Sequence, residues 1–167
     1  MRSADQRRAA TKVNRATRQA LRLVPADGDL DQLLVNVSRF RNRPLHLIEG
    51  DIGDAKTPSG LCVATKAGID YVMVDREATP SRRAAIVCHE IAHMLLGHQG
   101  AAPLADIAEH VAPDLDPRLV ARLLARHGYS AEIEQEAEAM GTVLATELAG
   151  RAAQHALAQD NVSARLR

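Results

Sequence analysis

A predicted helix that carries two histidines one turn apart constrains this chain more than any other feature. Thr79 is a candidate N-cap, Pro80 takes the first helical position, and Gly97 is a typical C-terminal stop. His89 and His93 are four residues apart, so their imidazoles point to a common side of the helix. The residues around them are apolar and predict a buried helix: Ile86, Val87, Ile91, Met94 and Leu95.

These histidines belong to an H-E-x-x-H motif, which is typical of zinc-dependent hydrolysis. Neutral imidazoles suit Zn²⁺, so we predict His89 and His93 as metal ligands. Glu90 lies one position round the helix and is predicted to take a proton from the attacking water as the general base. Cys88 points about 100° away from His89 and is expected to be a packed thiol rather than a ligand.

A catalytic zinc site has a third protein ligand, and the last predicted helix offers four glutamates at alternate positions. Helical periodicity narrowly favours Glu136, because it flanks the predicted buried side at Ala137. Small residues after it would allow this helix to approach the histidine-bearing helix closely. His98 follows Gly97 and is expected to lie at the end of the helix or to contact a metal ligand without binding the metal itself. The other glutamates stay open as ligands or as solvated residues: Glu132, Glu134 and Glu138.

The segment 89–98, HEIAHMLLGH, resembles the metal-binding helix of the ImmA/IrrE family of regulatory metallopeptidases. The upstream layout is also similar, with a hairpin that ends in Val74-Asp75 before a helix start of the Pro-x-Arg-Arg kind. The family's downstream Glu-Ala segment maps onto Glu136-Ala137. The resemblance therefore implies Glu136 as the third ligand, with Glu134 as the alternative. It covers roughly residues 30–148.

The resemblance implies a zincin-like fold and a zinc-dependent endopeptidase of regulatory type. Members of the family typically cut a helix-turn-helix repressor. No such motif is evident in this chain, so the expected partner is a separate repressor protein. A hairpin before the metal helix would supply an edge strand to which an extended peptide can add. The rival hypotheses are a non-catalytic zinc-binding regulatory or interaction module and a toxin–antitoxin or DNA-associated component.

The elements expected along the chain predict an α+β fold, in which a small three-stranded sheet packs on a mainly helical domain. Three short β-rich runs supply the sheet, and Gly68 lies in the turn of a hairpin formed by the last two: residues 45–49, 61–65 and 69–75. Long helices are expected at 4–24, 30–41, 80–97 and 130–159, with shorter ones at 104–111 and 117–128.

The chain is expected to form one main domain, because 167 residues are enough for a single core. We predict a basic N-terminal helical arm at 1–28, the metallopeptidase domain at 29–160 and a C-terminal tail at 161–167. The segment 2–24 of this arm carries seven basic residues against the single acid Asp5. We interpret the arm as a solvated helix packed along one side, with recognition of an acidic partner or nucleic acid as the alternative.

The composition argues against several classes of protein. Lys plus Arg and Asp plus Glu both number 21, and aromatic residues are 2%, which disfavours direct nucleic-acid binding by a polybasic or base-stacking surface. No apolar run approaches the ~18 residues of a membrane span, and the N-terminus lacks a signal-like apolar core. Cys62 and Cys88 are too few for a disulfide scaffold, so we expect two buried thiols in a cytoplasmic protein.

Peptide hydrolysis also needs a group that stabilises the developing oxyanion. Tyrosine and histidine side chains can donate the required hydrogen bond. Five residues are candidates, and the sequence does not choose among them: Tyr71, His98, His110, His127 and Tyr129.

Overall fold

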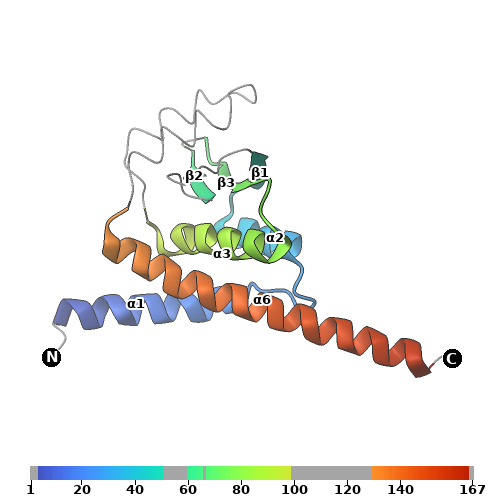
Figure 1. Cartoon of the computed structure of the whole chain (residues 1–167). Helices are drawn as coiled ribbons and strands as arrows, with labels where there is room; N and C mark the ends of the chain where they lie inside the picture. The colour runs from blue at the N-terminus through green and yellow to red at the C-terminus, as the bar shows by residue number, and fades with distance from the viewer. Residues whose placement is uncertain (1–3, 51–59, 66, 99–128, 166–167) are drawn as a thin grey trace.

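A computed structural model describes residues 4–50, 60–65, 67–98 and 129–165, and this part of the chain has the predicted α+β fold (Figure 1). The elements in chain order are α1 (Ala4–Leu21), α2 (Leu30–Arg41), β1 (Leu45–Gly50), β2 (Gly60–Ala64), β3 (Asp70–Asp75), α3 (Pro80–Leu96) and α6 (Ala131–Arg165). The sheet lies on one side of α3, and α6 crosses the opposite side with α1 next to it (Figure 1). The short helices predicted at 104–111 and 117–128 lie outside the described residues.

The three strands form a mixed sheet with the order β1-β3-β2. β3 pairs in parallel with β1, where Asp70 is opposite Leu45, and antiparallel with β2, where Val72 is opposite Cys62. The predicted hairpin between β2 and β3 is confirmed, and its turn contains Gly68 at a φ of +82°, which glycine adopts without strain. β2 is therefore an edge strand of the described sheet, and it lies against α3.

α3 is the element between the sheet and α6, and its predicted boundaries are confirmed. The side chain of Thr79 accepts a hydrogen bond from the N–H of Arg82, Pro80 begins the helix, and Gly97 ends it at a φ of +72°. Neighbours on both sides bury most of the helix after its first two turns. Its buried residues are Ile86, Val87, Cys88, Glu90, Ile91, Ala92, His93, Met94 and Leu96.

The carboxyl group of Asp70 joins three elements near the C-terminal end of α3. Asp70 is fully buried and accepts hydrogen bonds from Arg41 Nε at 2.6 Å and from Arg43 Nε at 2.7 Å. Arg41 also donates to the carbonyl oxygen of Met94 at 2.7 Å, and Arg43 donates to that of Thr65 at 2.6 Å. Because the buried charge is paired and hydrogen-bonded, this network holds α2 and β3 to the end of the histidine-bearing helix.

α6 packs on α3 through small and apolar side chains. A Cβ atom added to Gly141 would lie 2.8 Å from His89 Cα and 3.1 Å from His89 N, so the two helix backbones meet closely at this point. This confirms the expected use of a small residue in the approach of the two helices. The buried residues of the same face are Ala137, Met140, Leu144 and Leu148.

The C-terminal helix is longer than expected, whereas the N-terminal helix packs along one side as interpreted from the sequence. α6 continues beyond the predicted end near residue 159 to Arg165, so most of the expected tail is helical. Residues 152–161 are exposed. At the other end, α1 packs against α6 and contributes Ala20, which is 2% exposed, to the core.

Both cysteines are free thiols. Cys88 is fully buried in the core, as expected for a packed thiol, whereas Cys62 on β2 is partly exposed. None of the helices in the described part of the chain has the length and apolarity of a membrane-spanning segment.

We predict that Gly150→Ala and Gly141→Ala, two changes in the same helix, shift stability in opposite directions. Alanine favours the helix by about 1 kcal/mol at an open site such as Gly150, where an added Cβ meets nothing within 4 Å. At Gly141 the added Cβ meets the His89 backbone, and overpacking of about 1–3 kcal/mol outweighs that gain. Urea unfolding measures both effects, and equal stabilisation by the two changes would contradict the close approach.

Candidate metal centre

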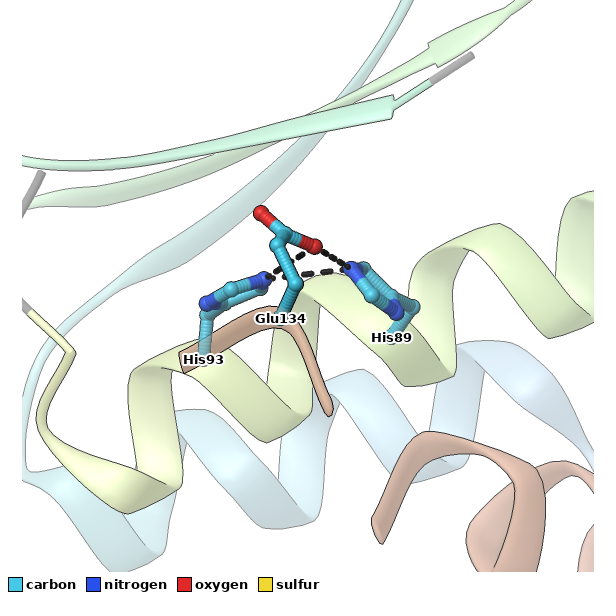
Figure 2. A group of neighbouring side chains, drawn as sticks. All are labelled: His89, His93 and Glu134. Atoms are coloured by element: carbon cyan, nitrogen blue, oxygen red, sulfur yellow. Dashed lines mark hydrogen bonds and ion pairs between the residues drawn. The ribbon is translucent and has the colours of Figure 1, made fainter. Parts of the chain in front are cut away.

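The side chains of His89, His93 and Glu134 converge on one point between α3 and the sheet (Figure 2). The two histidine Nε2 atoms are 3.1 Å apart. Oε2 of Glu134 lies 3.3 Å from His89 Nε2 and 3.7 Å from His93 Nε2. Successive turns of α3 supply the imidazoles, and the first turn of α6 supplies the carboxylate. The site therefore depends on the way these two helices pack.

The three separations suit a tetrahedral metal ion. Ligand atoms about 2.0–2.1 Å from zinc lie about 3.3 Å from one another at tetrahedral angles, and the observed separations are 3.1, 3.3 and 3.7 Å. Burial, followed by the neighbouring His89 and His98, lowers the pKa of His93 to about 4. His93 is therefore neutral at pH 7, which is the form that binds metals. Two imidazoles and one carboxylate form a donor set used by zinc hydrolases.

Glu134, rather than Glu136, lies beside the two histidines. The sequence predicts Glu136 as the third ligand and Glu134 as the alternative, and the structure brings together the alternative set. Oε2 of Glu136 instead lies 3.3 Å from Nε2 of His98. Glu138 lies on the far side of His89, with Oε2 3.3 Å from its Nδ1. Three of the four candidate glutamates thus contact histidines, but only one contacts the convergent Nε2 atoms.

The rotation of α6 about its own axis explains why Glu134, rather than Glu136, lies beside the two histidines. Gly141 is the point where α6 meets the backbone of His89. Glu134 is seven residues before Gly141 and lies about 20° from it around the helix, whereas Glu136 is five residues before and about 140° away. A glycine in a helix interior was the available signal for this contact. The periodicity of the apolar residues around Ala137 does not by itself predict this contact.

Glu90 lies between α3 and β2, next to the convergent histidines. It is 7% exposed, and burial raises its pKa to about 7. Hydrogen bonds from Cys62 oppose this rise and the charge of Glu134 adds to it. A Cβ atom added to Gly60 would lie 3.0 Å from Glu90 Oε1, so the strand lies directly on this carboxyl group. A carboxyl group with a pKa near neutrality can both accept and release a proton at pH 7.

Two of the candidate oxyanion-stabilising residues contact His93, namely His98 at Nδ1 of its ring and Tyr129 at the face of its ring. His98 is engaged on the side of His93 away from the convergent Nε2 atoms, which leaves Tyr129. Its ring stacks on that of His93, with centroids 4.1 Å apart and planes at 15°. Burial raises the pKa of Tyr129 well above its usual value, so its hydroxyl group stays protonated and can donate a hydrogen bond. Tyr71 stacks on His46 in the sheet instead. Two other candidates lie outside the described residues: His110 and His127.

A scan of protein-family models and searches of curated proteins and of solved structures find no match to this chain. The resemblance to the ImmA/IrrE family therefore stays a prediction, based on the segment 89–98 and the Glu-Ala segment.

We predict that Glu90 makes the metal-free protein less stable as the pH rises from about 4.5 to about 7. The folded state raises the pKa of this carboxyl group from 4.5 to about 7, so it binds more protons than the unfolded chain in this interval. The unfolding free energy therefore falls with rising pH, by roughly 3 kcal/mol. Urea unfolding of wild type and Glu90→Gln at about pH 4 and about pH 8 measures the change.

Glu90→Gln is expected to lack this loss, because the amide is neutral at every pH and keeps the shape of the protonated acid. Parallel pH profiles for the two proteins would contradict the raised pKa of Glu90.

We predict that Glu134→Ala abolishes stoichiometric zinc binding, because it removes one of the three convergent donors. Glu136→Ala is expected to retain zinc when the metal is in excess, since its carboxylate faces His98. Elemental analysis after dialysis against zinc measures both, with His89→Ala as the reference for a lost ligand. Zinc retained by Glu134→Ala but lost from Glu136→Ala would restore the ligand set that the sequence favours.

Proposed function

We propose that this chain is a zinc-dependent endopeptidase of regulatory type, with His89, His93 and Glu134 as ligands and Glu90 as the general base. The observation that carries the proposal is the state of Glu90, a buried carboxyl group with a pKa of about 7 beside the convergent histidines. A site that holds zinc only for stability has no use for such a group.

Zinc, when bound, would polarise the scissile carbonyl group and lower the pKa of the attacking water. Glu90 accepts the proton of that water at its carboxylate and later donates it to the leaving amine nitrogen. Tyr129, which stays protonated, donates a hydrogen bond to the oxygen on which negative charge develops. The chain itself thus supplies a group for each proton transfer and one for the developing charge.

The proposed substrate is an extended segment of another protein. β2 is an edge strand of the described sheet, and its residues Gly60 and Cys62 contact Glu90. A peptide that pairs with the outer edge of β2 would pass the general base in extended form. The resemblance to ImmA/IrrE proteins supports a helix-turn-helix repressor as this substrate, so cleavage would relieve repression.

The test compares the zinc-loaded wild type with Glu90→Gln on two substrates. A library of unstructured peptides, analysed by mass spectrometry, reports peptide-bond hydrolysis, and a helix-turn-helix repressor encoded beside this chain's gene reports the regulatory substrate. Glu90→Gln is expected to keep zinc and to lose about 10²–10⁴-fold in rate, because the general base is gone. Glu132→Gln removes the same charge from an exposed position of α6 and is the matched control.

The same variants distinguish the proposed endopeptidase from the rival function. If Glu90→Gln with zinc bound relieves repression as well as the wild type does, the chain is a non-catalytic zinc-binding regulator. If the wild type cleaves neither the library nor the repressor, the endopeptidase assignment is wrong.

A further inference from the structure

A chain of hydrogen-bonding groups lies behind His93, on the side away from the convergent Nε2 atoms. Nδ1 of His93 is 3.1 Å from Nδ1 of His98. Nε2 of His98 is in turn 3.3 Å from Oε2 of Glu136. The side chain of His98 is 7% exposed and that of Glu136 is 31% exposed, so most of this contact is shielded from water. These groups join α3 to α6 through residues that the proposed reaction does not use.

One placement of protons satisfies every group in this chain when His93 binds a metal. Nε2 of His93 then needs its lone pair for the ion, so its N–H is at Nδ1 and donates to Nδ1 of His98. His98 carries its own N–H at Nε2 and donates to the carboxylate of Glu136. The contacts therefore select opposite tautomers in the two rings, Nδ1–H in His93 and Nε2–H in His98.

The backbone at the end of α3 sets the position of His98. Gly97 has a φ of +72°, and the N–H of His98 donates to the carbonyl oxygen of His93 at 3.0 Å. This turn places the ring of His98 against that of His93, with centroids 5.1 Å apart and planes at 69°. Tyr129 stacks on the face of the His93 ring. His93 is thus held by one neighbour at its face and by another at Nδ1.

We propose that His98 and Glu136 are positioning residues, which hold His93 in the tautomer and orientation that bind the metal. This proposal rests on the proposed metal site and adds two residues that do not bind the ion. A carboxylate at the end of the chain also makes His93 a stronger electron donor. Glu138 is a weaker equivalent for His89, because it lies 3.3 Å from Nδ1 but is 71% exposed, so water competes with it.

The test measures the zinc dissociation constant of the full chain by competition with a chromophoric chelator. His98→Leu removes both hydrogen bonds and is expected to weaken zinc binding about 10–100-fold. His98→Gln, whose amide can accept from His93 and donate to Glu136, is expected to bind about tenfold more tightly than His98→Leu. Glu136→Gln is expected to weaken binding by about tenfold, and Glu138→Gln by less. Glu132→Gln, an exposed change in the same helix, is expected to have no effect.

A second measurement separates positioning from a purely structural role of His98. ¹⁵N NMR of the imidazoles in the metal-free protein is expected to show the Nδ1–H tautomer for His93 in the wild type. His98→Leu is expected to lose this preference, because the acceptor for that N–H is gone. A residue that only closes the end of α3 would change the unfolding free energy and leave the tautomer of His93 unchanged.

The outcomes separate this proposal from the proposed function. If His89→Ala binds zinc as tightly as the wild type, the metal site itself is wrong. If the wild type binds zinc there but His98→Leu and Glu136→Gln match Glu132→Gln in affinity and tautomer, the positioning role is wrong. If the affinities fall as expected while no peptide or repressor is cleaved, the positioning role stands and the endopeptidase assignment fails.

Discussion

The close contact of α3 with α6 at Gly141 is the constraint on which the candidate site depends. The absence of a side chain there lets the backbone of α6 reach that of His89. The first turn of α6 then lies where Glu134 can join the two imidazoles. A second glycine, Gly60, lets β2 lie directly on Glu90 from the opposite side. Two missing side chains thus place a carboxylate beside the histidines and bury the neighbouring carboxyl group.

The alternating glutamates of α6 divide their contacts because residues two apart point to different sides of a helix. Glu134 faces the convergent Nε2 atoms, Glu136 faces His98, and Glu138 faces Nδ1 of His89. About one and a half turns of α6 therefore contact the convergent Nε2 atoms and also the other ring nitrogens of the histidine cluster. Although the whole chain is neutral, these three carboxylates lie beside the imidazoles of the histidine cluster.

Local signals predicted most of the described fold. α3 begins at Pro80 and ends before Gly97, because a side-chain cap and a left-handed glycine satisfy the helix ends within a few residues. The hairpin follows in the same way from β-rich runs around Gly68. The end of α6 was placed too early, since residues 160–165 contain neither glycine nor proline to stop the helix before Arg165.

Local sequence patterns predict one part of the candidate site, and contacts between distant segments determine the other part. The convergence of His89 and His93 and the adjacent position of Glu90 follow from the i, i+4 geometry of one helix, so the motif is sufficient to predict them. The choice of Glu134 over Glu136 does not follow from any local pattern. It depends on how α6 is rotated about its axis when it packs on α3, and contacts between segments far apart in the chain set that rotation.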